Sequence, residues 1–363
     1  MAWRLLDLGY VDPYRAQCFY EATALAVSKG IAPPTVIFCL PASPYVCIGV
    51  HQILENVVDV DYCKTQGYPT IRRSLGGGAV FLNSHQLFFQ IIGPKDHPQV
   101  PPRVDDLFRY FLTAIVAAYR RLGIPAEYRP VNDIVVRGRK ISGTGAGIWG
   151  NAVIVVGNFI MDFNFDEAAR VLRVPDEKFR DKLVSSMREW ITSIRRELGT
   201  IPPLEEIKQA AIEGFKTIGI ELKPGEVTPE EKRFFAEEVL PRHKSHEWLH
   251  AITSDHPTLF HRVKVAHDVT VVEVRYKARK LIRVIAQLDG YQIRDIAIAG
   301  DFFAIPYTVV KRIESALTGK SLDDENAVRT AIQQAIQQSD ATLVGATPED
   351  IFNAVLQLRT AVS

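Results

Sequence analysis

The chain has 363 residues, of which 47% are hydrophobic and 23% are charged, a balance typical of a globular protein with a large core. The 43 lysine and arginine residues nearly balance the 42 aspartate and glutamate residues, so bulk charge favours neither nucleic acid nor an anionic membrane as a partner. No apolar run approaches the roughly 18 residues of a membrane-spanning helix, and residues 1–17 lack a secretion signal, so we expect a cytoplasmic protein.

Helical and strand patterns alternate along the first two thirds of the chain. Residues 13–30 and 104–123 carry apolar side chains at helical spacing, and each segment ends at a glycine suited to a helix C-terminus. Residues 166–240 are more charged and are mostly helical in pattern. Short runs rich in β-branched and aromatic residues predict strands of one mixed sheet at 34–41, 45–50, 79–92, 132–136 and 152–163.

A different pattern begins near residue 258, after the turn residues and proline of 251–258. Residues 260–303 alternate as a series of strands. Helical patterns then occupy 307–319, 324–338 and 348–360. We therefore predict an α/β protein of the α+β type, with a large mixed-sheet domain at 1–252 and a small α/β domain at 258–363.

The cysteines are Cys18, Cys39, Cys47 and Cys63, all in the first part of the chain. They lack C-x-x-C spacing and lie among apolar residues, as in YVCIGV. We expect buried thiols in a reducing compartment rather than disulfides, metal ligands or nucleophiles.

Two arginines followed by three glycines, in IRRSLGGGAVF at residues 71–81, form the densest polar and glycine-rich motif. Glycines let backbone N–H groups approach an anion, and Arg72 and Arg73 would supply charge and forked donors, so the motif suggests a phosphate or carboxylate cradle. It is not a Walker loop, because no Gly-Lys-Ser/Thr follows, and a dinucleotide fingerprint would need a helix where strand is predicted. Alone, the motif also fits a hairpin turn with two solvated arginines.

A second motif, NDIVVRGRKISGTGAG at residues 132–147, places a lysine beside further glycines. The strand that begins at Asn132 and Asp133 turns at Gly138 and returns through Lys140 into a predicted flexible, N–H-rich loop. A lysine held among such amides is suited to neutralising a carboxylate and a phosphate as they react. Alone, Lys140 also fits an exposed hairpin lysine. Together, the two motifs indicate one site for a nucleotide phosphate and a carboxylate.

A third motif, HEWLH at residues 246–250, has the H-E-x-x-H spacing of zinc proteases, with His256 where a third ligand would fall. The longer metzincin pattern requires a glycine where this chain has Thr253, and it requires a later methionine, whereas the last methionine is Met187. We therefore do not expect a catalytic zinc. Whether the histidine-rich segment 243–261 ever binds a metal stays open.

Three stretches, in this order, resemble the lipoate–protein ligases, within the wider family that includes biotin ligases and octanoyl transferases. They are RRSLGGGAVF (72–81), NDIVVRGRKISG (132–143) and AVIVVGNFIMDF (152–163). In addition, DGYQIRDIAIAGDFF (289–303) is similar to the accessory domain of these ligases, so the resemblance covers most of the chain. It implies a biotin/lipoate-ligase-like catalytic domain followed by an accessory domain.

In that family lipoate and ATP form lipoyl-adenylate, and the acyl group then passes to the ε-amine of a lysine on a small acceptor domain. The resemblance implies that Lys140 contacts the acyl carbonyl and the phosphate. Mg²⁺ would accompany ATP as a co-substrate, with no dedicated metal site and no permanent cofactor. The residues implied to bind ATP or the acyl-adenylate are Arg72, Arg73, Gly76, Gly77, Gly78, Ala79, Val80, Phe81, Asn132, Asp133, Ser142, Gly143 and Thr144.

The implied partner is a lipoyl-acceptor protein or domain, similar to the glycine-cleavage H-protein or to a dehydrogenase E2 lipoyl domain, and we expect no nucleic acid and no membrane. Octanoyl transferases of this superfamily use a cysteine nucleophile in place of ATP. In one branch that cysteine lies just before the strand leading to the lysine loop, where this chain has Asn132 and Asp133, and no cysteine follows Cys63. This favours an ATP-dependent ligase. Biotin ligases carry a G-R-G-R-x-G-R loop, whose later arginine is missing here.

Two alternatives stay open: an ATP-independent octanoyl or lipoyl transferase, and a non-catalytic protein that binds lipoyl domains. The chain also departs from the ligase pattern. Leu82 and Asn83 follow the first motif in place of a histidine and an aspartate, VVGN at 155–158 replaces a common histidine pair, GVHQ at 49–52 lacks an arginine, and GTGAG at 143–147 replaces G-S/T-A-x-R. The choice between lipoate and octanoate, the acceptor and the oligomeric state are therefore left open.

The resemblance also accounts for HEWLH. Ligases of this family commonly carry Ser-x-Glu-Trp where the large domain ends, and Ser245, Glu247 and Trp248 match it. We therefore expect Glu247 to be structural and Trp248 to anchor the junction between the domains.

Overall fold

The computed structural model describes residues 3–174, 179–256, 259 and 269–361, and the chain forms two compact units. The first unit consists of Met1–Cys47, Val57–Ile71 and Val80–Lys244. The second consists of Ile48–Asn56, Arg72–Ala79 and Ser245–Ser363. Two short loops from the N-terminal half of the sequence therefore belong to the same unit as the C-terminal residues.

The first unit is built on a six-stranded mixed sheet. In order across the sheet its strands are β10 (Thr144–Trp149), β11 (Ala152–Ile160), β6 (Gln86–Pro94), β2 (Thr35–Pro41), β1 (Trp3–Val11) and β12 (Leu222–Pro224). β11 pairs with β6 in antiparallel register along its whole length, from Ala152 opposite Pro94 to Ile160 opposite Gln86. β1 runs parallel to both β2 and β12.

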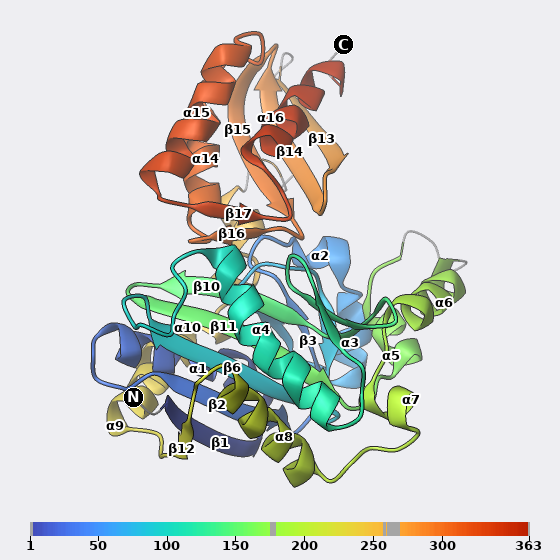
Figure 1. The fold of residues 1–363 in the computed structure, drawn as a ribbon. Helices are drawn as coiled ribbons and strands as arrows, with labels where there is room; N and C mark the ends of the chain where they lie inside the picture. Colours follow the sequence, from blue (N-terminus) through green and yellow to red (C-terminus); the bar gives the residue numbers. More distant parts are fainter. Residues whose placement is uncertain (1–2, 175–178, 257–258, 260–268, 362–363) are drawn as a thin grey trace. The chain divides into compact units, whose positions relative to one another are not determined.

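Helices pack on this sheet and bury its central strands. β6 is buried from Gln86 through Gly93, which requires cover on both faces. The first helix, α1 (Pro13–Ser28), packs on β2, β6 and β11, while α4 (Val104–Arg121) and α8 (Leu204–Thr217) lie side by side (Figure 1). Gly214 permits their close approach, because a Cβ there would lie 2.2 Å from the carbonyl oxygen of Ala114.

The remaining helices of the first unit are shorter. They are α3 (Val60–Gln66), α5 (Phe165–Val171), α6 (Arg180–Trp190), α7 (Ile194–Leu198), α9 (Pro229–Phe234), the π-helix η2 (Phe235–Val239) and α10 (Leu240–Lys244). The helical pattern expected at 13–30, 104–123 and most of 166–240 is thus confirmed.

The prediction of a single sheet is wrong, because two of the predicted strands belong to small separate sheets. One contains β4 (Thr70–Arg72), β3 (Tyr45–Ile48) and β5 (Val80–Leu82), and the other contains β7 (Glu127–Arg129), β8 (Asp133–Val136) and β9 (Arg139–Ser142). The run 79–92 is divided between β5 and β6, because the side chain of Asn83 accepts the N–H of His85 at 2.9 Å and forms a turn. The α/β class itself, with mixed sheets, is confirmed.

The second unit contains a three-stranded antiparallel sheet with helices packed on it (Figure 1). Its strands are β13 (Val269–Lys277), β14 (Leu281–Asp289) and β15 (Gln292–Gly300), beside a two-stranded ribbon of β16 (Phe303–Ile305) and β17 (Thr342–Val344). Its helices are α2 (Leu54–Val57, of which Val57 belongs to the first unit), α11 (His246–Leu249), α12 (Ala251–Asp255), α14 (Val309–Leu317), α15 (Glu325–Gln338), α16 (Pro348–Leu356) and the 3₁₀-helix η3 (Gln357–Ala361). Residues 260–268 of the predicted strand series lie outside the described residues.

One buried core holds the second unit together. It joins side chains from the sheet, such as Val284 and Ile298, to side chains from the helices, such as Ile313, Val328 and Phe352. Across the described ranges of both units, no helix is long and apolar enough to cross a membrane.

A buried ion pair connects β1, at the start of the first unit's sequence, to α9, near the end of that sequence. The guanidinium of Arg4 in β1 donates to the carboxylate of Glu231 in α9 at 2.9 Å, and the two side chains are 9% and 0% exposed. Burial would raise the pKa of Glu231, but the hydrogen bonds and charge of Arg4 lower that pKa below its usual value. Glu231 also closes the capping box of α9 with Thr228.

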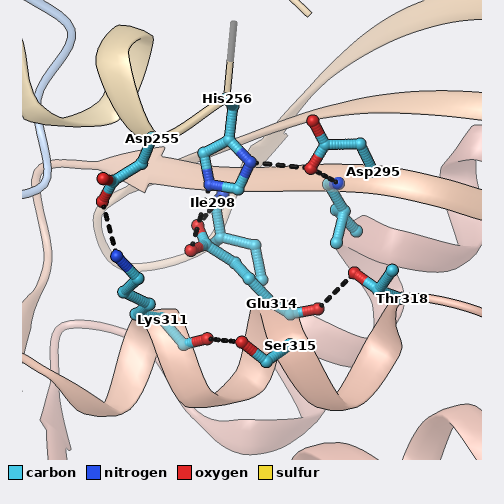
Figure 2. Close-up of polar contacts among 9 residues, drawn as sticks. Asp255, His256, Asp295, Ile298, Lys311, Glu314, Ser315 and Thr318 are labelled. Atoms are coloured by element: carbon cyan, nitrogen blue, oxygen red, sulfur yellow. Dashed lines mark hydrogen bonds and ion pairs between the residues drawn. The ribbon is translucent and has the colours of Figure 1, made fainter. Parts of the chain in front are cut away.

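His256, directly after α12, lies between two carboxylates of the second unit (Figure 2). Its Nδ1 is 2.7 Å from Asp295 Oδ1 in β15, and its Nε2 is 3.4 Å from Glu314 Oε2 in α14. Glu314 is almost fully buried and also accepts the N–H of Ile298 at 2.6 Å. Burial would lower the pKa of His256, but its hydrogen bonds to Glu314 and Asp295 raise that pKa to about 9. The imidazolium therefore links the end of α12 to both β15 and α14.

Replacing Glu231 by glutamine should lower the free energy of unfolding by about 3–5 kcal/mol near neutral pH, because the charge of Arg4 stays buried without its counterion. Since the folded-state pKa of Glu231 is the lower one, the pair stabilises fully above the unfolded pKa and loses this effect as the pH falls through the folded pKa. Urea denaturation of the full chain between about pH 3 and pH 7 should show the two proteins converging in acid. Glu230→Gln, exposed on the same helix, is the control, and a constant difference at all pH values would contradict the prediction.

Replacing His256 by glutamine should remove a pH-dependent part of the stability. Because the folded-state pKa of His256 is the higher one, its contribution is full below the unfolded value of about 6.5 and is lost as the pH rises through about 9. Denaturation of the full chain across this pH window should show that the free energy of unfolding of wild type falls as the pH rises, toward that of the variant. The exposed His85→Gln serves as control, and parallel pH profiles of wild type and His256→Gln would refute the link.

Candidate active site

The hairpin of β8 and β9 brings the predicted lysine to a carboxylate. Lys140 Nζ lies 2.9 Å from Asp133 Oδ1, and Arg129 in β7 lies 3.0 Å from the other oxygen of Asp133. Burial would raise the pKa of Asp133, but Lys140 and Arg129 together lower that pKa below its usual value. Asp133 is therefore ionised at neutral pH and holds the ammonium of Lys140, which is 32% exposed and so accessible to an anionic substrate.

The segment after the lysine is a strand and not the predicted flexible loop. Thr144–Trp149 pairs with β11 in antiparallel register, from Thr144 opposite Gly157 to Trp149 opposite Ala152. Because β10 is an edge strand, its N–H groups that face β11 are bound in the ladder, and only the alternate ones face outward. Gly157 permits this packing, since a Cβ there would lie 2.3 Å from Cζ of Phe89.

A chain of side-chain hydrogen bonds fixes the turn between β9 and β10. Gly143 N–H donates to Oδ1 of Asn158 at 2.8 Å, and the amide of Asn158 donates to Gln86 Oε1 at 2.7 Å. Gln86 donates in turn to the carbonyl of Phe81 at 3.2 Å. The predicted residues Phe81 and Gly143, far apart in the sequence, are thereby joined through two buried amides.

Three further predicted residues surround the same turn. Asn132 donates to the carbonyl of Thr144 at 3.1 Å, and the hydroxyl of Thr144 donates back to the carbonyl of Asn132. Ser142 is fully buried, and its Oγ has no hydrogen-bond partner among the described residues. The two bonds between Asn132 and Thr144 therefore tie the residue before β8 to the first residue of β10, next to the end of the strand that carries Lys140.

The two arginines of the first motif bind main-chain carbonyl groups of the second unit. Arg72 is 1% exposed, and its guanidinium donates to the carbonyls of Val50 at 2.8 Å, Gln52 at 2.6 Å and Leu249 at 2.8 Å. Arg73 donates to the carbonyl of Gly76 at 2.7 Å and to that of Gly78 at 2.9 Å. Arg73 thus stabilises its own glycine-rich loop, and Arg72 binds other segments of the same unit. A role of Arg72 and Arg73 in nucleotide binding stays a prediction.

Within the second unit, Gly76 packs closely against the segment after β15. A Cβ on Gly76 would lie 2.6 Å from the carbonyl oxygen of Phe302 and 2.7 Å from Cα of Phe303. The neighbouring loop is tied to the same segment, because Gln52 donates to Asp301 at 2.8 Å. Close backbone approach therefore explains Gly76 without any ligand.

The structure divides the predicted site residues between its two units, and each set is described by itself. The first unit holds Val80, Phe81, Asn132, Asp133, Lys140, Ser142, Gly143 and Thr144. The second unit holds Arg72, Arg73, Gly76, Gly77, Gly78 and Ala79.

The cysteines are free and buried, as the sequence predicted: Cys18, Cys39, Cys47 and Cys63. Burial raises the pKa of the thiols of Cys18, Cys39 and Cys63, to about 11 for Cys63. A thiol with a raised pKa is a poor nucleophile, because the reactive species is the thiolate.

The HEWLH motif does not form a metal centre in the described part of the chain. His246 and His250 stack at 4.3 Å between ring centroids, His250 Nδ1 lies 2.7 Å from Glu55, and His256 binds two carboxylates. The described residues contain no group of three or more His, Cys, Asp or Glu side chains placed to hold a metal ion. His261, the last histidine of the histidine-rich segment 243–261, lies outside the described residues.

Two residues of the Ser-x-Glu-Trp match, Ser245 and Trp248, make structural contacts, whereas Glu247 is exposed, so its structural role and an anchoring role of Trp248 between the domains stay predictions. Ser245 caps α11 by accepting the N–H of Trp248 at 3.1 Å. The indole N–H of Trp248 donates to the carbonyl of Arg72 at 2.8 Å, within the second unit.

Sequence reasoning missed several residues around Lys140. Arg129 shares Asp133 with the lysine, and Tyr119 donates to the carbonyl of Ile141 at 2.9 Å. Thr192 and Glu197 contact the hairpin from a distant segment. No local signal marks Tyr119, Thr192 or Glu197, because their partners are remote in the sequence, whereas Arg129 lies only four residues from Asp133.

Comparison with known proteins gives the family. The family model of the lipoyl protein ligase A/B catalytic domain matches residues 12–216. The octanoyltransferase LipM of Kyrpidia tusciae is 28% identical over 269 residues, covering 68% of this chain and 97% of that protein. Lipoate-protein ligase A subunit 1 of Thermoplasma acidophilum is 32% identical over 220 residues, covering 56% of this chain and 79% of that protein.

Comparison with solved structures points to the same family. The bi-partite lipoate protein ligase of Thermoplasma acidophilum, described with its E2 lipoyl domain, matches with a TM-score of 0.61 and 27% identity over 73% of this chain and 100% of that chain. A lipoate-protein ligase A bound with ATP matches with a TM-score of 0.59 and 26% identity over 69% of this chain and 98% of that one. The LipL1 of P. falciparum, in complex with lipoate, shares the fold over 99% of both chains, with a TM-score of 0.62 and 13% identity. The chain therefore belongs to the lipoyl protein ligase A/B catalytic domain family, which holds lipoate–protein ligases and octanoyltransferases within the biotin/lipoate ligase superfamily.

Proposed function

We propose that the protein activates lipoate or octanoate with ATP to form an acyl-adenylate and transfers the acyl group to a lysine of a lipoyl-acceptor domain. Residues 1–252 would carry out catalysis, and residues 258–363 would form the accessory domain. Lys140 would be the catalytic cation.

The observation that carries this proposal is the composition of the lysine hairpin. Where one branch of octanoyl transferases has its nucleophilic cysteine, this chain has Asn132 and Asp133, and no cysteine follows Cys63 in the sequence. Asp133 is committed to an ion pair with Lys140. The buried thiols of the described residues lie elsewhere and have raised pKa values where a shift is evident. The hairpin therefore supports charge neutralisation and not covalent thioester chemistry.

The chemistry requires a cation at this position. Attack of a carboxylate on the α-phosphate of ATP brings two anions together, and a preorganised ammonium lowers the energy of that transition state. Lys140 would leave Asp133 in part to meet the substrate, while Asp133 keeps Arg129 as a second partner. Mg²⁺ would enter with ATP, bridging its phosphate oxygens, as a co-substrate.

The resemblance assigns nucleotide and acyl contacts to the glycine-rich loop and, separately, to the turn after the lysine. Backbone groups of the 76–81 segment and the residues Asn132, Ser142, Gly143 and Thr144 would contact the acyl-adenylate. For the loop this requires exchange of the carbonyl bonds that Arg73 now makes with Gly76 and Gly78. The ATP-bound ligase to which the chain is similar supports nucleotide use, and the E2 lipoyl domain described with the archaeal ligase supports an acceptor of that type.

A second candidate function is ATP-independent octanoyl transfer. The similarity to octanoyltransferase LipM over 97% of that protein favours it. It would need another nucleophile or direct transfer from the donor to the acceptor, because the hairpin has no thiol.

Replacing Lys140 by alanine should lower the rate of lipoate-dependent ATP–pyrophosphate exchange by a factor on the order of 10²–10³. This is the effect of losing one preorganised hydrogen-bond donor. The fold should be unaffected, because the side chain is partly exposed and its main chain stays bonded. Lys95→Ala, at an exposed lysine of the same unit, is the matched control. An alanine variant with wild-type exchange would refute the assignment of Lys140.

Acylation of an acceptor domain should require ATP and should survive alkylation of accessible thiols. The test is mass spectrometry of an E2 lipoyl domain or an H-protein after incubation with the enzyme, Mg²⁺ and either lipoate or octanoate. The incubation is done with and without ATP. Each is repeated after the enzyme has been treated with iodoacetamide. The mass added to the acceptor identifies the acyl group. Transfer from octanoyl-acyl carrier protein without ATP would instead establish the transferase, whether or not iodoacetamide blocks it.

A further inference from the structure

We propose that Glu197 is a positioning residue that fixes Lys140 for catalysis, through the turn of the lysine hairpin and through Thr192. This inference rests on the proposed function, because it concerns the cation of the same site. Glu197 itself lies outside the set of residues that would touch the substrate.

Glu197 is a buried carboxylate with three partners around the hairpin. Its side chain is 2% exposed, and it accepts from Arg137 at 2.9 Å, from Arg139 at 3.2 Å and from the hydroxyl of Thr192 at 2.5 Å. A buried carboxylate is stable only when hydrogen bonds and opposite charges replace its water. Arg137 lies three residues before Lys140 and Arg139 one residue before it, so the position of the carboxylate is coupled to that of the hairpin on the lysine side.

The turn itself needs this support. Arg137 has φ 48° and Gly138 has φ 78°, the pair of left-handed residues that a two-residue type I′ hairpin requires. Glycine adopts this conformation readily, but arginine does so at an energetic disadvantage, since Asn, Asp or Gly is usual at the first position. The ion pair with Glu197 offsets that disadvantage and selects this turn over other geometries. The register of β9, and hence the direction of Lys140, follows from the turn.

Thr192 connects the same carboxylate to Lys140 from the other side. Its backbone N–H donates to the carbonyl of Lys140 at 2.9 Å, and the neighbouring Ile191 forms a parallel bridge with Lys140. The hydroxyl of Thr192 is held by Glu197. The side chain of Glu197 thus holds both Arg139, which precedes Lys140, and Thr192, which binds the carbonyl of Lys140.

The short helix α7 holds Glu197 in place. Ser193 caps the helix by accepting the N–H of Arg196 at 3.2 Å, and the N–H of Arg195 donates to the carbonyl of Met161 at 3.0 Å, just beyond β11. Glu197 is therefore attached to the central sheet and not to a free loop. Displacement of a reacting group by about 1 Å lowers rates by on the order of 10², which is the scale on which such a support acts.

The test uses Glu197→Gln in the full chain, because glutamine keeps the size and one acceptor oxygen but removes the charge that binds two arginines. We expect kcat for lipoate-dependent ATP–pyrophosphate exchange to fall by about 10–100-fold, while KM for ATP changes by less than about twofold. Glu189→Gln, exposed on α6, is the matched control and should have wild-type kinetics. Arg137→Asn should lower kcat less than Glu197→Gln does, because asparagine suits the left-handed turn and the ion pair of Arg139 with Glu197 stays.

A double-mutant cycle with Lys140→Ala separates positioning from general loss of structure. If Glu197 acts through the lysine, Glu197→Gln has no further effect on the residual exchange rate of Lys140→Ala. The inference is overturned by wild-type kcat in Glu197→Gln, by a loss confined to KM, or by an equal loss in both backgrounds. If wild-type protein shows no exchange, the proposed function fails, and the same cycle measured on octanoyl transfer to the acceptor decides the role of Glu197 by the same criteria.

Discussion

The antiparallel pairing of β6 with β11 is the constraint on which the rest of the first unit depends. This pair lies inside the six-stranded sheet, and its register sets Asn158 close to Gln86, so that one buried amide binds the other and reaches Gly143. Among the strands that the structure describes, β10 pairs only with β11, and it follows directly after the lysine hairpin. A shift of one residue between β6 and β11 would reverse which side chains face α1 and would separate these two amides. Core packing and the geometry around Lys140 are therefore determined by the same ladder.

The charged groups of the two motifs are used in opposite ways. Lys140 is partly exposed and bound to a carboxylate that has a second cationic partner, so its ion pair can be exchanged for a substrate without leaving a bare charge. Arg72 is buried and surrounded by carbonyl oxygens, and removing it would leave several buried acceptors without donors. The first arrangement suits reaction with an anion, and the second suits the maintenance of a loop conformation. Residue type alone did not distinguish them.

Much of the fold was predictable because its signals are local. The helices at Pro13–Ser28 and Val104–Arg121 follow from spacing and from their C-terminal glycines, and β2 follows from an unbroken apolar run. β1 was not predicted, because its partners β2 and β12 are remote in sequence and its own pattern is irregular. β10 was predicted as a loop, because glycine weighs against strand unless a partner such as β11 is already known. Around the lysine hairpin, the sequence singled out Lys140 and Asp133, which the structure pairs, but not Glu197, since burial of a glutamate in a charged helical segment leaves no trace in the local pattern.

The packing of Gly76 has a consequence for how this loop can vary between relatives. The family match ends at residue 216, yet the atoms that forbid a Cβ at Gly76 belong to Phe302 and Phe303. The loop is thus restricted by a region that the family model does not span, in addition to any restriction from a ligand. A loop transplanted from a relative would fit this chain only if it also accommodates these two phenylalanines, and substitutions at 76 and at 302–303 are expected to be inherited together.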